Sequence, residues 1–190
     1  MQRKGWCCLQ EAPYAESDVV GFHGTSKSKA ATIVFNQEFK SSEHDYDWLG
    51  HGIYFWPGSL DHGMRWAVDR HGSDSAVVQA TIHYGRCLDL SKTEYVPLLK
   101  TSRKELEEDY KRRGLPLPAN NGKEHYLDCA VVEWLLTRHV EADTVVGVFR
   151  EGTDLFPGSM FQDLSHIQIA VRNPRNLAGR FEKVWEARTP

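Results

Sequence analysis

Three short stretches of the sequence combine residue types that could bind a ligand or carry out a reaction. The first is GFHGTS at 21–26, where an imidazole, a glycine and a hydroxyl follow one another. The second is DWLGHGIYFW at 47–56, which holds two Trp, a Tyr, a Phe and a His around two glycines. The third is SHIQIAVRNP at 165–174, with His166 and Gln168 on one face of an expected strand. Together they suit a flat, polar ligand.

Each stretch also has a purely structural interpretation. The HGT sequence is typical of a strand that ends in a glycine turn with a capping Thr. Aromatic residues at the density of 47–56 form either a hydrophobic core or a platform for a ring, and we expect Trp48 and Phe55 to belong to the core.

Hydrophobic patterning places the three stretches within an α+β fold. We expect a single domain of 190 residues, with 1–17 as an N-terminal extension and 93–123 as a helical and loop insert. The predicted strands cover 19–23, 76–84, 144–149 and 166–172, the predicted helices cover 28–39, 60–70 and 127–138, and a long loop covers 150–165.

The order of these motifs carries more information than any one of them. A strand bears His23, a helix follows, and GIYF begins about thirty residues further on. Over roughly 19–177 this arrangement resembles the ADP-ribosyltransferases, in the branch of the poly(ADP-ribose) polymerases and diphtheria toxin. The resemblance implies the ADP-ribosyltransferase-like fold, in which two small, packed, mainly antiparallel β-sheets are flanked by helices and hold NAD in a cleft between them.

The resemblance also implies roles for individual residues. His23 would hydrogen-bond a ribose hydroxyl of NAD, and the backbone of Gly24 would meet the nicotinamide amide, because glycine permits such close approach. Tyr54 would lie against the nicotinamide ring, where offset stacking contributes about 0.5–1.5 kcal/mol beyond burial. Thr25 and Gly52 are the other expected NAD-binding positions. His23 and Tyr54 are also expected to be catalytic.

The third catalytic position departs from the family pattern. Aligning QIAV with the family's late strand puts Gln168 where a catalytic Glu is expected. A carboxylate stabilises the oxocarbenium-like transition state of glycosidic cleavage. The loss of one preorganised electrostatic partner typically costs about 2.7–4 kcal/mol. We therefore expect a slower or more substrate-dependent enzyme that transfers single ADP-ribose units.

Two sources of compensation lie near Gln168 in the sequence. Loop carboxylates could replace the missing Glu, with Asp163 nearest along the chain and Glu151 and Asp154 as alternatives. His166 lies on the same face of the strand and could act as a base toward the acceptor.

The composition of the chain bears on which partners it can bind and on the cellular compartment in which we expect it. A net charge of −3 does not favour a nucleic-acid binder, although basic runs occur at 111–114 and 171–180. The four cysteines show no metal-binding spacing and are expected to be free thiols, and we expect no metal site. The absence of an apolar run of membrane-spanning length and of a secretory signal predicts a cytoplasmic protein without membrane contact.

The sequence therefore predicts an NAD-dependent mono-ADP-ribosyltransferase that uses NAD as substrate and modifies a protein side chain or a nucleic-acid base. A small domain of this kind resembles intracellular bacterial toxins and defence effectors, which implies an antitoxin partner. Two alternatives stay open: a catalytically impaired NAD-binding interaction module, and an NAD glycohydrolase in which water replaces the acceptor.

Overall fold

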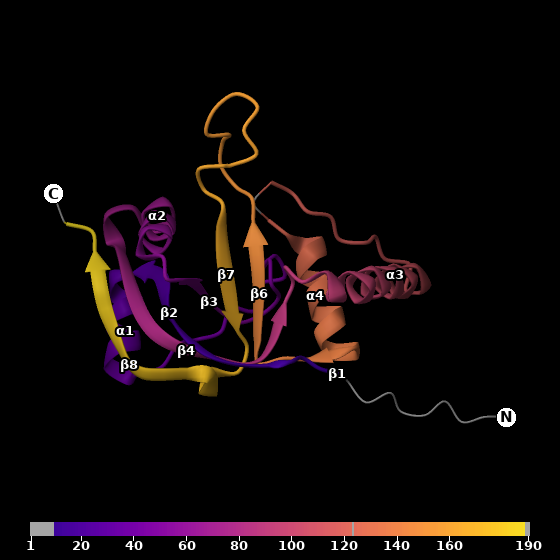
Figure 1. The fold of residues 1–190 in the computed structure, drawn as a ribbon, viewed down its shortest axis with the longest axis horizontal. Coiled ribbons are helices and arrows are strands. Elements are labelled where there is room, and N and C mark those ends of the chain that lie inside the picture. The colour runs from indigo at the N-terminus through magenta and orange to yellow at the C-terminus, as the bar shows by residue number, and fades with distance from the viewer. Residues whose placement is uncertain (1–9, 123, 189–190) are drawn as a thin grey trace.

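The computed structural model describes residues 10–122 and 124–188, which form an α+β fold (Figure 1). Four α-helices flank the strands in this part of the chain. The strands are β1 (Gln10–Glu11), β2 (Tyr14–Ser26), β3 (Ile53–Pro57), β4 (Ser75–Asp89), β5 (Val140–Glu141), β6 (Thr144–Phe149), β7 (His166–Val171) and β8 (Leu177–Glu186). The helices are α1 (Lys27–Asn36), α2 (Leu60–His71), α3 (Val96–Arg112) and α4 (Tyr126–Arg138).

The main sheet has the strand order β2-β3-β7-β6-β4-β8, and β2 also pairs with β4. Adjacent strands in this sheet are antiparallel, except that β4 and β6 are parallel. The expectation of mainly antiparallel pairing is therefore confirmed. The two small packed sheets that were expected are joined in the structure into one six-stranded sheet. The long strand β4 pairs with β2 and β8 and then continues to β6 through Cys87–Asp89, so backbone hydrogen bonding runs without a break from one half to the other.

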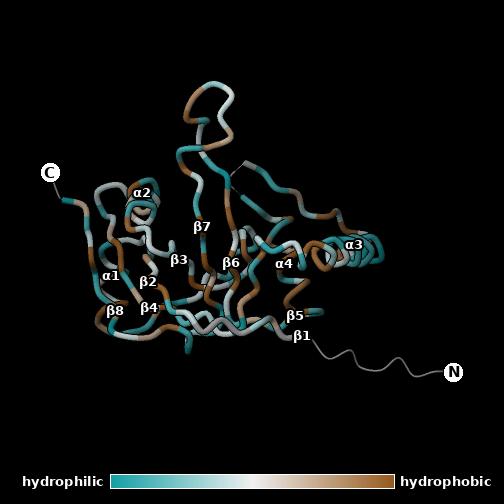
Figure 2. Tube along the Cα trace, viewed as in Figure 1, coloured by the Kyte–Doolittle hydropathy of each residue, from teal (hydrophilic) through white to brown (hydrophobic). Residues whose placement is uncertain are grey.

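Two clusters of buried side chains hold the sheet between its helices. One gathers Phe39, Phe55 and Ile169 with residues of α1, and the other gathers Leu49 and Leu135 with residues beneath α4. Strands β3 and β7 contribute to both clusters, because their alternate side chains point to opposite faces. Figure 2 accordingly shows apolar segments alternating with more polar ones along the strands. The same two strands carry the candidate site.

Several predicted elements are confirmed, and others are extended. The helices expected at 60–70 and 127–138 correspond closely to α2 and α4, and the 93–123 insert contains α3. The expected extension at 1–17 is wrong in part, because residues 10–17 already contribute to β1 and β2; residues 1–9 lie outside the described residues. Strand β8 was not predicted as a separate element.

Two further expectations concern membranes and thiols. Within residues 10–122 and 124–188, no helix has the length and apolar character needed to cross a bilayer. Cys87 and Cys129 are buried free thiols, as expected, while Cys7 and Cys8 lie outside the described residues.

Candidate functional site

Three neighbouring strands bring the predicted site residues together. β2 pairs with β3 through Phe22 and Trp56, and β3 pairs with β7 through Tyr54 and Ala170. The later part of β2, strand β3 and the second half of β7 therefore lie side by side. A cavity of about 1610 Å³ extends from these strands to α1, α2 and the base of the 150–165 loop. Its lining includes His23, Gly24, Thr25, Gly52, Tyr54 and Gln168.

The His23 ring is fixed in one orientation. Its Nδ1 donates a hydrogen bond to the Tyr54 carbonyl oxygen at 2.9 Å, and its ring lies 5.2 Å from the Phe39 ring and 5.7 Å from the Phe55 ring. Burial lowers the pKa of His23, which favours the neutral imidazole. With the hydrogen on Nδ1, Nε2 keeps a lone pair, and it has no hydrogen-bond partner among the described residues. This nitrogen can accept a hydrogen bond from a hydroxyl in the cavity.

The Tyr54 hydroxyl is committed to the protein itself. It donates to the Gly50 carbonyl at 2.6 Å and accepts from the Leu49 amide at 2.9 Å. Burial raises the pKa of Tyr54, so the phenol stays protonated. Gly50 has a φ of +75°, a conformation that favours glycine. Since the hydroxyl holds this turn, Tyr54 can offer a ligand only its ring.

The sequence analysis missed the pair that anchors the same turn from behind. Arg172 Nη1 donates to Glu133 Oε1 at 2.5 Å and to the His51 carbonyl at 2.8 Å. Glu133 Oε1 also accepts from the His51 backbone N–H at 2.6 Å. Arg172 is therefore a structural cation at the start of the basic 171–180 run. This role could not be predicted from the sequence, because Glu133 lies 39 positions before Arg172.

Gly24 also has a role in packing, and its expected contact with NAD stays a prediction. A Cβ at Gly24 would lie 2.5 Å from the Gly63 carbonyl oxygen and 3.0 Å from the Trp66 ring, so its absence allows α2 to pack directly on β2. This packing brings Trp66 to within 5.8 Å of the Trp56 ring, and both line the cavity. Trp66 is therefore a further aromatic residue that lines the cavity. In the sequence, only the RWA triplet on an expected helix pointed to it.

Gln168 and His166 form a connected pair at the start of β7. Gln168 Nε2 lies 2.9 Å from His166 Nε2, and His166 Nδ1 lies 2.7 Å from the Leu164 carbonyl oxygen. Both nitrogens of His166 are therefore engaged, which leaves no free lone pair for the expected role as a base. The neighbouring residue Ile167 points away and is 47% exposed.

The three loop carboxylates have different surroundings. Glu151 lines the cavity, and its Oε2 lies 3.8 Å from His166 Nδ1. Asp163 accepts a hydrogen bond from the Thr153 backbone N–H at 2.7 Å, and Asp154 is exposed. Asp163, the nearest in sequence, thus serves the loop's own structure. Glu151 is the loop carboxylate with access to the cavity.

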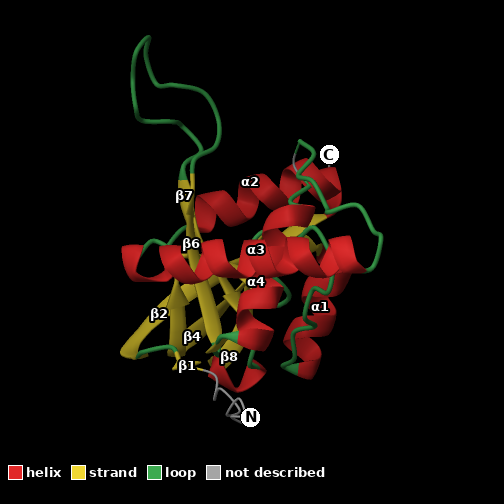
Figure 3. Cartoon of the chain, turned by 90° about the vertical axis from the view of Figure 1, so that its right-hand side faces the viewer, coloured by secondary structure: helices red, strands yellow, loops and turns green. Residues whose placement is uncertain are grey.

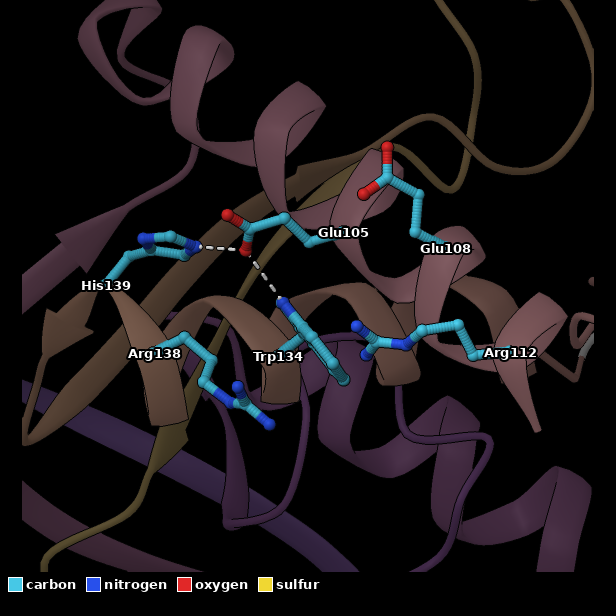
Figure 4. A pocket seen from close by; sticks show the side chains of 6 residues that line it. All are labelled: Glu105, Glu108, Arg112, Trp134, Arg138 and His139. Atoms are coloured by element: carbon cyan, nitrogen blue, oxygen red, sulfur yellow. Dashed lines mark hydrogen bonds and ion pairs between the residues drawn. The ribbon is translucent and has the colours of Figure 1, made fainter.

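A second cavity, of about 340 Å³, lies between α3 and α4 and shares no lining residue with the first. Figure 4 shows Trp134 and His139 directed at Glu105, whose Oε2 accepts from Trp134 Nε1 at 3.0 Å and from His139 Nε2 at 2.7 Å. The hydrogen bond from Trp134 is the main cause of the lowered pKa of Glu105. These contacts tie the insert helix to α4.

Comparison with known proteins adds little to this geometry. No protein-family model matches the chain. An uncharacterized protein of the archaeon Methanocaldococcus jannaschii is 30% identical over 82 residues. The match covers 39% of this chain and 38% of the archaeal protein. The assignment of a function therefore depends on the site.

Proposed function

We propose that the protein is an NAD-dependent mono-ADP-ribosyltransferase with an ADP-ribosyltransferase-like fold. The observation that carries the proposal is the convergence of His23, Tyr54 and Gln168, far apart in the sequence, on one cavity through three adjacent strands. A cavity of about 1610 Å³ has room for a dinucleotide.

The free polar groups of the cavity fit the parts of NAD. The lone pair on His23 Nε2 suits a ribose hydroxyl, and the rings of Tyr54 and Trp66 suit a flat pyridine ring. Lys29, in the first turn of α1, lines the same cavity and supplies a positive charge for a pyrophosphate.

The reaction needs little covalent chemistry from the protein. The bond between the ribose C1′ and nicotinamide breaks, and its electron pair passes to the pyridinium nitrogen. The acceptor nucleophile bonds to C1′ and releases a proton. Gln168 contributes a neutral hydrogen-bond acceptor where a carboxylate would be stronger, which supports transfer of single units.

The 150–165 loop favours a protein over a nucleic acid as the acceptor. It joins the end of β6 to the start of β7 and projects well clear of the helices (Figures 1 and 3). The loop contains three carboxylates and one guanidinium, a balance that repels a phosphate backbone. Four of its large apolar side chains are at least 58% exposed, namely Leu155, Phe156, Met160 and Phe161. An exposed apolar surface of this kind is typical of protein-binding sites.

The ion pairs of arginines in the two basic runs also favour a protein acceptor. In the basic run at 111–114, both Arg112 and Arg113 form ion pairs with Asp109. In the run at 171–180, Arg172 is paired with Glu133. Each of these three guanidiniums has a carboxylate partner within the chain, so each attracts a polyanion less than an unpaired arginine would.

Transfer of label from NAD tests the proposal. The protein is incubated with NAD labelled in its adenylate half and with cell lysate, and aliquots are then treated with protease or nuclease. We expect a macromolecular label that protease releases and nuclease leaves intact. Release by nuclease would identify a nucleic-acid acceptor instead.

The same assay separates the alternatives. NAD binding without label or nicotinamide release would identify an interaction module. Nicotinamide release without label would identify an NAD glycohydrolase. An intracellular toxin of this class would also require an antitoxin protein that covers the cavity or the loop, and such a partner should suppress the label.

A further inference from the structure

Two hydrogen bonds fix the protonation of His166. A carbonyl oxygen can only accept, so the contact of His166 Nδ1 with the Leu164 carbonyl requires a hydrogen on Nδ1. An amide nitrogen can only donate, so the contact with Gln168 Nε2 requires a lone pair on His166 Nε2. Both contacts demand the same state, a neutral imidazole protonated at Nδ1.

The same contacts fix the direction of the Gln168 carboxamide. Because its nitrogen faces His166, its oxygen is the end left for the cavity, and Oε1 has no hydrogen-bond partner among the described residues. If the carboxamide were turned over, a donor would take the place of this acceptor. A donor cannot accept a hydrogen bond from a ribose hydroxyl.

We infer that His166 is a positioning residue for ADP-ribose transfer, which holds the Gln168 carboxamide with its oxygen toward the NAD cavity. This inference rests on the proposed function. His166 acts through Gln168 and replaces the role of acceptor base that the sequence suggested for it.

The surroundings of His166 prevent its ring from turning away. Its side chain is 6% exposed, and its ring lies 5.6 Å from Phe149, 6.4 Å from Trp56 and 5.2 Å from His62. The titratable groups that face it are Glu151 from the loop and His62 from α2. The packed ring therefore keeps Nε2 against the Gln168 carboxamide.

The decisive experiment is a double-mutant cycle in the full chain. His166→Phe keeps a ring but removes the acceptor, so we expect kcat to fall about tenfold as the Gln168 side chain regains its rotamer freedom. The KM for NAD should stay within about twofold, because ground-state binding is unchanged. In the Gln168→Glu background the same change should cost less than about twofold, since a carboxylate presents oxygen in either orientation.

A matched histidine variant controls for general effects. His83 lies on β4, bonds Asp18 and does not line the cavity, so His83→Phe should leave kcat unchanged. An equal loss from His166→Phe in both backgrounds, or no loss in either, would overturn the positioning role.

A readout that needs neither activity nor a variant is the imidazole tautomer. Nitrogen-15 NMR of the wild-type protein should show His166 protonated at Nδ1 and unprotonated at Nε2. The opposite tautomer would overturn the inference even in an active enzyme. A protein with the expected tautomer but no transfer from NAD would instead refute the proposed function, and with it the role of the pair in transfer.

Discussion

The cavity and the 150–165 loop lie next to each other but are built in opposite ways. In the cavity, the polar side chains are tied to backbone groups, as His23 is to Tyr54 and the Tyr54 hydroxyl is to Gly50. The loop ties its backbone to itself, through Leu155 N to the Phe161 carbonyl and Asp163 N to the Thr153 carbonyl. It thereby holds its apolar side chains outward.

This difference suggests a division of work. A site whose polar groups are fixed before binding suits one constant small ligand. A projecting apolar loop suits a macromolecular partner and can change its side chains without disturbing the strands below. Changes in the cavity should therefore affect every reaction of NAD, and changes at the loop tip should affect only transfer to a protein.

The largest expected effect of a change in the cavity is an increase in the rate of ADP-ribose transfer. Gln168→Glu restores a carboxylate at the position where charge develops, so we expect transfer to rise about 100-fold. Single-turnover rates of nicotinamide release measure the change. Gln162→Glu, which adds the same charge within the loop, should have little effect. A fall in rate after Gln168→Glu would show that Gln168 does not occupy the family's glutamate position.

The free energy of unfolding should decrease in acid, because the contacts of Asp143 are lost. Asp143 accepts hydrogen bonds from Arg86 and Asn173 and so joins β4 to the segment after β7. The hydrogen bond from Arg86 lowers the pKa of Asp143 from 3.8 to about 2. Because the folded-state pKa is depressed, the stabilisation is complete above pH 4 and is lost as the pH falls toward 2, amounting to about 2 kcal/mol.

Urea unfolding at a series of pH values measures this loss. Asp143→Asn should lower the free energy of unfolding at pH 7 and flatten its dependence between pH 4 and 2. If the variant retained the full acid dependence of the wild-type protein, another carboxylate would be responsible.

The smallest expected effect concerns the loop. Replacing Phe156 and Phe161 with Ser removes two exposed apolar side chains, and we expect transfer to the protein acceptor to fall about tenfold. Hydrolysis of NAD by water should change less than about twofold. Phe35→Ser, at an exposed site on α1, is the matched control. An equal fall in transfer and hydrolysis would refute the division between cavity and loop.

The sequence predicted the local patterns well and the long-range contacts poorly. Strand alternation placed His166 and Gln168 on one face, and the helical spacing at 60–70 and 127–138 identified α2 and α4. The Glu133–Arg172 pair escaped prediction because its residues are 39 positions apart and only Arg172 lies in one of the three stretches, where no local pattern points to Glu133. The role of Trp66 in the cavity depends on how closely α2 approaches Gly24, which no local pattern reveals.

Calorimetric titration with NAD tests the central claim most directly. The wild-type protein and His83→Ala should bind NAD equally, and His23→Ala should bind at least about tenfold more weakly, because Nε2 no longer receives a ribose hydroxyl. Thermal unfolding of each variant verifies that the fold persists. If the wild-type protein does not bind NAD, or if His23→Ala binds it as tightly, the cavity is not a site for this dinucleotide.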